Sequence, residues 1–172
     1  MSLGFTVRPA EAGDAEAMAA IHLQAWQESY GHLLSEKFFA DRKARLPERA
    51  QQYRAHIAGP NTWVVAEADG ELVGLAAGGP GSDEDRPGET ALFMIYALRR
   101  VHGTGVGQAL LDAVIGREAA YLWVLEDNPR AQAFYRRNGF VPDGKRELLP
   151  PEWEELPEIR MVRSAGPGGR GV

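Results

Sequence analysis

The first sixty residues carry the apolar spacing of one strand followed by helices. Residues 5–10 are rich in strand-forming side chains and close on a proline, so they predict a first strand. A helical repeat follows Asp14, which can cap it. The apolar face of this helix consists of Met18, Ile21, His22 and Ala25. A second helical stretch begins at Ser35, breaks at Pro47 and resumes over residues 48–58.

The middle of the chain predicts strands around two turns and then one helix. Two β-rich runs flank Asp69-Gly70, a pair suited to the type I′ turn of a hairpin. Residues 80–89 have the composition of a loop. The apolar run over residues 90–98 predicts another strand, and the helical spacing that follows predicts a helix over residues 106–118.

The last part of the chain predicts a strand, a helix and a final strand. Residues 121–125 form a short apolar run typical of a buried strand. The next helix has clear end signals, because Asn128 can be its N-cap, Pro129 its first residue and Gly139 the residue after its end. Residues 156–162 then alternate in the manner of a strand.

The order of these elements indicates the fold class. The predicted order is strand, two helices, three strands, helix, strand, helix and two strands. This order implies an α/β fold with a mixed, mostly antiparallel sheet of six to seven strands. Helices are expected on both faces of this sheet. We expect one domain over residues 4–163, and a disordered tail over the glycine-rich residues 164–172.

Composition and charge narrow the classes of function. A chain of 172 residues with a net charge of −5 suits one acidic domain, and no nucleic-acid partner is expected without a basic face. The chain has no cysteine, which removes disulfides, thiolate metal sites and cysteine nucleophiles and fits a reducing cytoplasm. It contains no apolar stretch long enough to span a membrane and no signal peptide. We therefore expect a cytoplasmic protein without a membrane partner.

Three glycines stand between a predicted strand and a predicted helix, at positions 103, 105 and 107. A helix N-terminus presents unpaired N–H groups and a partial positive charge. Glycines let an anion approach that backbone closely. The turn therefore predicts a phosphate cradle, with a tight turn that binds nothing as the alternative.

Other phosphate-binding classes fit the chain less well. A P-loop needs a lysine and a hydroxyl residue after its last glycine, and neither is present here. A dinucleotide-binding turn would have its third glycine at Gln108, although Glu126 and Asp127 fall where the ribose-binding acid is expected. That fold and a methyltransferase both need several further strand–helix units, and too few residues follow Leu125 to form them.

Two blocks of the sequence resemble the GNAT superfamily of N-acetyltransferases. The block LRRVHGTGVGQALLDAV, residues 98–114, resembles the family's Q/R-x-x-G-x-G/A motif at the start of a helix. The block YLWVLEDNPRAQAFYRRNGF, residues 121–140, resembles its strand, asparagine and helix with an aromatic-Tyr pair before Gly-Phe. The resemblance covers residues 62–141 and implies the acyl-CoA N-acyltransferase fold.

The resemblance also implies a site for acetyl-coenzyme A as cosubstrate, without a metal. The strands over residues 90–98 and 121–125 are expected to splay apart, so that backbone groups of the first can pair with the pantetheine arm. The pyrophosphate would lie on the N–H groups of residues 103–108. The implied coenzyme-binding residues are Tyr96, Ala97, Leu98, His102, Gly103, Thr104, Gly105, Val106, Gly107, Gln108 and Asn128.

The same resemblance implies acyl transfer from a thioester to an amine. Tyr135 is expected to protonate the departing thiolate, with ring packing alone as the alternative. A backbone N–H near Ala97 or Leu98 is expected to stabilise the oxyanion. The general base is left open between a chain of water molecules and three carboxylates: Glu28, Glu89 and Glu126.

His102 departs from the family motif, which has Gln or Arg in that position. A histidine reaches less far and is mostly neutral near pH 7. Arg99 or Arg100 can supply the missing charge instead. A role for His102 as a catalytic base is the alternative.

The acceptor pocket is expected to be lined by the N-terminal helical segment and the loop 80–89. Trp26 and Tyr30, one helical turn apart, can line its pocket or simply pack in the core. The acidic residues within the loop 80–89, which are Asp83, Glu84 and Asp85, can steer a cationic amine or be solvated. We expect an N-acetyltransferase for a primary amine of a small molecule or peptide. A catalytically silent module that binds acetyl-coenzyme A as a sensor or partner is the alternative, and the oligomeric state, a homodimer included, is left open.

Overall fold

The computed structural model describes residues 4–166, which form two compact units. The first unit comprises the residues up to Gly79 together with Met94–Val114. The second comprises Pro80–Phe93 and the residues from Ile115 onward. Within the described part of the chain, no helix is long and apolar enough to cross a membrane.

Within residues 4–166, seven strands are hydrogen-bonded in the order β1-β2-β3-β4-β5-β7-β6. Their bounds are β1 Thr6–Pro9, β2 Thr62–Ala68, β3 Glu71–Pro80, β4 Thr90–Ala97, β5 Ala120–Leu125, β6 Val141–Leu148 and β7 Pro157–Arg163. The pairs β1–β2, β2–β3, β5–β7 and β6–β7 are antiparallel, whereas β4–β5 is parallel. The predicted mixed, mostly antiparallel sheet is therefore confirmed.

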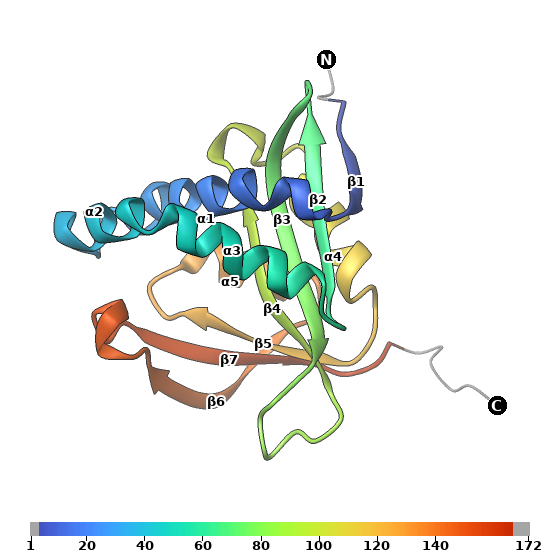
Figure 1. Ribbon diagram of the computed structural model, residues 1–172. Coiled ribbons are helices and arrows are strands. Elements are labelled where there is room, and N and C mark those ends of the chain that lie inside the picture. The colour runs from blue at the N-terminus through green and yellow to red at the C-terminus, as the bar shows by residue number, and fades with distance from the viewer. Residues whose placement is uncertain (1–3, 167–172) are drawn as a thin grey trace. The chain divides into compact units, whose positions relative to one another are not determined.

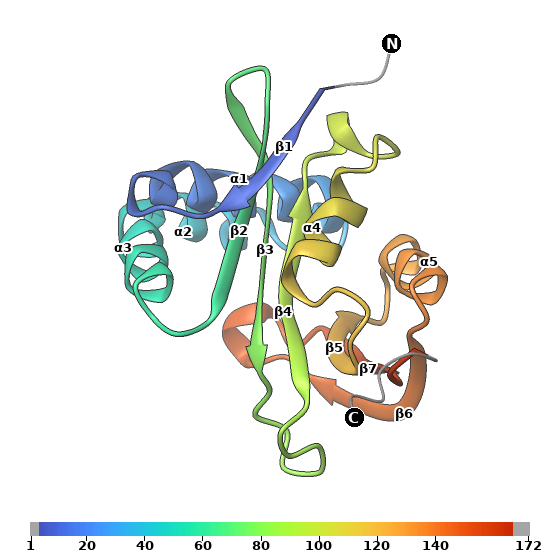
Figure 2. The same cartoon turned by 90° about the vertical axis from the view of Figure 1, so that its right-hand side faces the viewer.

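In the first unit, helices cover both faces of the strands (Figures 1 and 2). The helices α1 (Ala15–Tyr30), α2 (Glu36–Ala44) and α3 (Leu46–Ile57) lie on one face, and α4 (Val106–Val114) lies on the other. Alternation along β2 explains this arrangement, since successive side chains point to opposite faces. Val65 packs in the cluster that contains Met18 and Tyr53, whereas Val64 packs in the cluster that contains Leu110.

In the second unit, α5 (Pro129–Arg137) begins and ends as the sequence predicts. The Asn128 Oδ1 accepts a hydrogen bond from the N–H of Ala131 at 3.1 Å, which caps the helix. Gly139 follows the helix with a φ of +87°, and the N–H of Phe140 donates to the carbonyl of Tyr135. This left-handed residue ends α5 and turns the chain toward β6.

The structure corrects three local expectations. The helix α4 ends at Val114 rather than at residue 118, because Gly116 takes a left-handed conformation with a φ of +52°. The break between α2 and α3 falls at Arg45, and Pro47 lies in the first turn of α3. Asp14 occupies the cap position of α1 but makes no cap bond. Of the predicted tail, residues 167–172 lie outside the described residues.

The Asp14 side chain bonds to Arg8 and to the backbone of Glu11 instead of capping α1. Its carboxylate accepts hydrogen bonds from the Arg8 guanidinium at 2.8 Å and 3.0 Å and from the N–H of Glu11. The pKa of the Asp14 carboxyl is below its usual range, mainly because of the hydrogen bonds from Arg8. Asp14 therefore fastens β1 to the start of α1.

Candidate active site

The glycine turn joins β4 to α4 and contains two residues with left-handed backbone. Gly103 has a φ of +78° and Gly105 a φ of +95°, whereas Gly107 lies within α4. A Cβ added to Gly103 would meet no heavy atom within 4 Å, and one added to Gly105 would meet only the Phe5 ring edge at 4.0 Å. These glycines therefore supply backbone conformation and leave open space beside the turn.

The start of α4 supplies donors to this open space. The hydrogen bond from the N–H of Ala109 to the carbonyl of Gly105, at 3.0 Å, closes the first turn of the helix. The N–H groups of Val106 and Gly107 precede it at the helix N-terminus, where donors have no carbonyl partner within the helix. Together with the helix dipole, they make a suitable site for an anion.

The polar side chains of the turn contact the backbone and one another. The His102 Nε2 lies 2.8 Å from the carbonyl oxygen of Ala97, and the Thr104 hydroxyl donates to the carbonyl of Val101 at 2.6 Å. The Gln108 amide donates to Asp112 along the helix surface. His102 thus ties the end of β4 to the turn, a role that the sequence did not predict.

Arg99 and Arg100, the proposed substitutes for a motif charge, both have acidic partners. The Arg99 side chain donates to the backbone carbonyl of Glu28, and its N–H donates to the carboxylate of Glu28 at 2.7 Å. Arg100 forms an ion pair with Glu71 at 3.0 Å, and both side chains are exposed. Such an exposed pair contributes little stability, so Arg100 can exchange Glu71 for another anion.

The pairing of β4 with β5 covers only part of each strand. It runs from Thr90 opposite Ala120 to Leu92 opposite Leu122, although β4 continues to Ala97. Among the described residues, the pairing of β4 with β5 therefore ends before residues 96–98, whose backbone is predicted to pair with pantetheine.

Tyr96, Ala97 and Leu98, which form this backbone, are firmly held within the first unit. A Cβ on Gly74 would lie 2.8 Å from the carbonyl oxygen of Tyr96, so β3 approaches β4 closely there. The Tyr96 ring stacks on the buried His22 ring, with centroids 4.6 Å apart. The N–H of Leu98 donates to the carbonyl of Val73 at 2.9 Å, which leaves the amide near Ala97 as the candidate oxyanion donor.

Tyr135 lies on α5 and is buried in the second unit. Its ring makes edge contacts with the rings of Phe134 and Phe140, at centroid distances of 5.5 Å and 6.0 Å. Asn128, the other residue predicted for coenzyme binding in this unit, directly precedes the helix. Its oxygen caps α5, as described above, so the capping role of Asn128 is confirmed.

The three carboxylates considered as general bases each have a partner. Glu28 accepts hydrogen bonds from Gln24 and from the N–H of Arg99. Glu89 pairs with Arg86 at 2.9 Å, and Glu126 pairs with Arg146 at 3.0 Å. Glu89 and Glu126 are thus each held by a guanidinium, whereas the Glu28 carboxylate is held by a side-chain amide and a backbone N–H.

The aromatic residues on α1 pack with each other. Trp26 and Tyr30 lie edge to face with centroids 4.7 Å apart, and Trp26 also stacks on Phe38 at 6.2 Å. Both Trp26 and Tyr30 are buried. Burial lowers the pKa of the neighbouring His22 to about 3, so this histidine is neutral at physiological pH. Core packing therefore accounts for these rings in the first unit.

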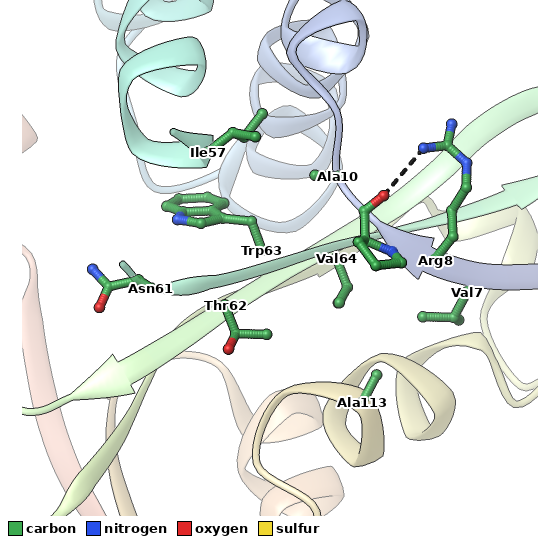
Figure 3. Close-up of a pocket in the computed structure, with 10 residues that line it drawn as sticks. Val7, Arg8, Ala10, Ile57, Asn61, Thr62, Trp63, Val64 and Ala113 are labelled. Atoms are coloured by element: carbon green, nitrogen blue, oxygen red, sulfur yellow. Dashed lines mark hydrogen bonds between the residues drawn. The ribbon is translucent and has the colours of Figure 1, made fainter. Parts of the chain in front are cut away.

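A pocket of about 440 Å³ lies at the outer strands β1 and β2. Figure 3 shows Trp63 pointing toward Ile57 of α3, while Thr62 and Val64 point toward Ala113 of α4. The residues that line this pocket include none of those predicted to bind the coenzyme. It therefore belongs to the β1–β2 side of the first unit and not to the glycine turn.

Arg160 is a buried residue that the sequence did not single out. Its guanidinium forms ion pairs with Asp83, Asp85 and Asp143 at 2.6 to 2.7 Å. Hydrogen bonds from Arg160 hold the pKa of Asp85 well below its usual range. Asp83 also accepts a hydrogen bond from the Trp123 indole. Asp83 and Asp85 therefore anchor the loop 80–89 to β7, which argues against their predicted role in steering an amine.

Comparison with known proteins identifies the family. A family model described as the acetyltransferase (GNAT) family matches residues 16–140. The chain belongs to this family. The chain is 26% identical to a probable N-acetyltransferase of Mycobacterium tuberculosis over 171 residues, which covers 94% of this chain and 96% of the relative. Membership in the GNAT family makes the chain an acyltransferase of the acetyl-coenzyme A-dependent class.

Solved GNAT structures share the fold. A GCN5-related N-acetyltransferase from Rhodopseudomonas palustris superposes with a TM-score of 0.72 at 23% identity, covering 95% of this chain and 98% of that one. The PaiA N-acetyltransferase from Thermoplasma acidophilum, solved in complex with coenzyme A, superposes with a TM-score of 0.70 at 16% identity, covering 94% and 99%. The predicted GNAT fold is therefore confirmed.

Proposed function

We propose that this GNAT protein transfers the acetyl group of acetyl-coenzyme A to a primary amine of a small molecule or peptide in the cytoplasm. The observation that carries the proposal is the glycine turn before α4. Two left-handed glycines face open space, and the N–H groups at the start of α4 follow directly. This combination suits the pyrophosphate of the coenzyme.

The coenzyme would be held by backbone more than by side chains. The pyrophosphate would accept hydrogen bonds from the N–H groups of residues 103–108, and the pantetheine amides would pair with β4 over Tyr96 and Ala97. Asn128 would offer its amide nitrogen to the pantetheine arm, because its oxygen already caps α5. Acetyl-coenzyme A supplies the activated acetyl group as a thioester.

Tyr135 would act as the general acid. Its hydroxyl would give a proton to the coenzyme sulfur as the carbon–sulfur bond breaks, which prevents release of an unstabilised thiolate. Packing against Phe134 and Phe140 fixes the ring, so the hydroxyl is held in one direction. The N–H near Ala97 would donate to the oxygen that gains negative charge.

Thiol release tests the proposed function. Wild-type protein is mixed with acetyl-coenzyme A and separately with polyamines, amino acids, aminoglycosides and peptides with free N-termini, and free thiol is measured over time. We expect amine-dependent release with at least one class. Tight binding of acetyl-coenzyme A without release for any class would instead support a silent acetyl-coenzyme A-binding module.

A further inference from the structure

Glu158 is a half-buried carboxylate on β7 that has no basic partner. Among residues 4–166, its side chain forms no ion pair and no hydrogen bond. Glu89 and Glu126 differ from it, because each pairs with an arginine side chain, and Glu28 accepts hydrogen bonds from Gln24 and from the backbone N–H of Arg99. No ion pair or hydrogen bond within residues 4–166 therefore gives the half-buried Glu158 side chain a structural role.

The strand register places Glu158 at the end of β5. Its Cα pairs with that of Leu125, the last residue of β5, and the N–H of Glu126 donates to the carbonyl of Pro157 at 2.9 Å. Asn128 and the helix that carries Tyr135 begin just beyond this point. Glu158 thus lies beside the end of β5 from which the chain continues to Asn128 and α5.

The alternation of β7 places the two groups on opposite faces. Arg163 lies over the Phe140 ring at 4.7 Å, which assigns one face of β7 to the side of α5 and Tyr135. Arg160 lies over the rings of Tyr121 and Trp123, at 5.9 Å and 5.8 Å, on the other face. Glu158 is two residues from Arg160 and shares that second face.

We propose that Glu158 is the general base that removes a proton from the acceptor's ammonium group. This inference rests on the proposed acetyl transfer. In that reaction the nitrogen loses two protons. Glu158 takes the first and releases it to water; the free amine then forms the carbon–nitrogen bond. As the carbon–sulfur bond breaks, Tyr135 gives its proton to sulfur. The second proton then leaves the nitrogen and restores the Tyr135 hydroxyl.

The charges around Glu158 suit this task. Glu147 of β6 lies directly opposite it across the strand pair, and Asp83 approaches from the loop 80–89. Burial, followed by these two carboxylates, raises the pKa of Glu158 to about 7. The nearby cation Arg160 is bound by three aspartates, and Arg146 is bound by Glu126. A base with a pKa near neutrality can both accept and release a proton at pH 7.

The test compares Glu158→Gln with a matched variant, Glu147→Gln. We expect Glu158→Gln to bind acetyl-coenzyme A with unchanged affinity in calorimetry and to lose about 10²–10⁴-fold in kcat/KM at pH 7. The loss should shrink at a pH above the pKa of the amine, where free amine is abundant. Glu147→Gln should keep the plateau activity and move the acidic limb of the kcat/KM profile, expected near pH 7, to lower pH.

Other outcomes separate this inference from the proposed function. An unchanged pH profile in both variants would overturn the role of Glu158 while acetyl transfer stands. A higher KM with unchanged kcat in Glu158→Gln would make Glu158 a residue that binds the ammonium group and would also overturn its role as a base. Absence of turnover in the wild-type protein with every amine would overturn the proposed function itself.

Discussion

Tyr135 carries the proposed acid chemistry with one hydroxyl. In Tyr135→Phe the ring keeps its contacts with Phe134 and Phe140, so we expect the fold and the affinity for coenzyme A to be retained. In the proposed mechanism the hydroxyl acts only as the thiolate departs, so we expect kcat and kcat/KM to fall together by about 10²-fold. Steady-state kinetics with the best amine measures both. Unchanged kcat, with chemistry shown to limit the rate, would make Tyr135 a packing residue.

The raised pKa of Glu158 also predicts a pH-dependent stability. Between its usual range and about 7, the folded protein binds the proton of Glu158 more tightly than the unfolded chain does, so stability falls as pH rises through this window. Glu158→Gln removes this loss. We expect the variant to be more stable than wild type by about 1 kcal/mol at pH 8, a figure reduced for the partial exposure of the side chain.

Urea denaturation at pH 5 and pH 8 measures this difference. The advantage of Glu158→Gln should largely disappear at pH 5, where wild-type Glu158 is protonated in the folded protein. The difference between the two proteins isolates Glu158 from the carboxyls of Asp85 and Asp143, whose pKa values are lowered instead. An equal difference at both pH values would contradict the assigned pKa.

We expect coenzyme binding to depend on the turn before α4. Gly105→Asp puts a side chain and a negative charge into the open space of the cradle, at a φ of +95°. We expect the thermal stabilisation by coenzyme A to be lost, because a ligand stabilises only the state that binds it. Gly70→Asp is the matched control, since Gly70 has a φ of +77° and no neighbour within 4 Å of an added Cβ.

Differential scanning fluorimetry with and without coenzyme A compares these variants. Gly70→Asp should lose a similar amount of stability through backbone strain but keep the full shift with coenzyme A. Equal shifts in Gly105→Asp and Gly70→Asp would show that the pyrophosphate lies elsewhere.

The strand β7 and the loop 80–89 depend on Arg160. Arg160→Met leaves three carboxylates without their shared cation, and we expect a loss of about 3–5 kcal/mol in the free energy of unfolding. Arg146→Met is the matched control, because the ion pair of Arg146 with Glu126 is exposed and should contribute under about 1 kcal/mol. Urea denaturation measures both, and similar losses would contradict the central role of Arg160.

The sequence predicts those elements whose signals are local. The Asp69-Gly70 turn, the cap of α5 by Asn128 and the left-handed Gly139 are all confirmed, because each depends on residues next to one another. The strand β6 has no such signal, since all of its residues are exposed and no alternation marks its bounds. It forms as an edge strand through its pairing with β7.

Long-range electrostatics explains what the sequence could not predict. Arg160 is far along the chain from Asp83 and Asp85, and only the fold brings them together. In the sequence, Arg160 alternates with Ile159 and Met161 like a solvent-facing residue of a strand, so no local signal marks its burial. The fold likewise joins Glu28 to the N–H of Arg99 and Glu126 to the side chain of Arg146. That pairing directs attention to Glu158, which the sequence did not single out.

For the whole molecule, the central claim is transfer of an acetyl group to an amine. The most direct measurement incubates the protein with acetyl-coenzyme A carrying an isotopically labelled acetyl group and an amine panel, followed by mass spectrometry of the amines. We predict a labelled, acetylated amine that forms at a rate proportional to enzyme concentration, is absent with Gly105→Asp and is reduced with Tyr135→Phe. Label that stays entirely on the coenzyme or is released as acetate with every amine, while the wild-type protein binds acetyl-coenzyme A, would contradict the claim.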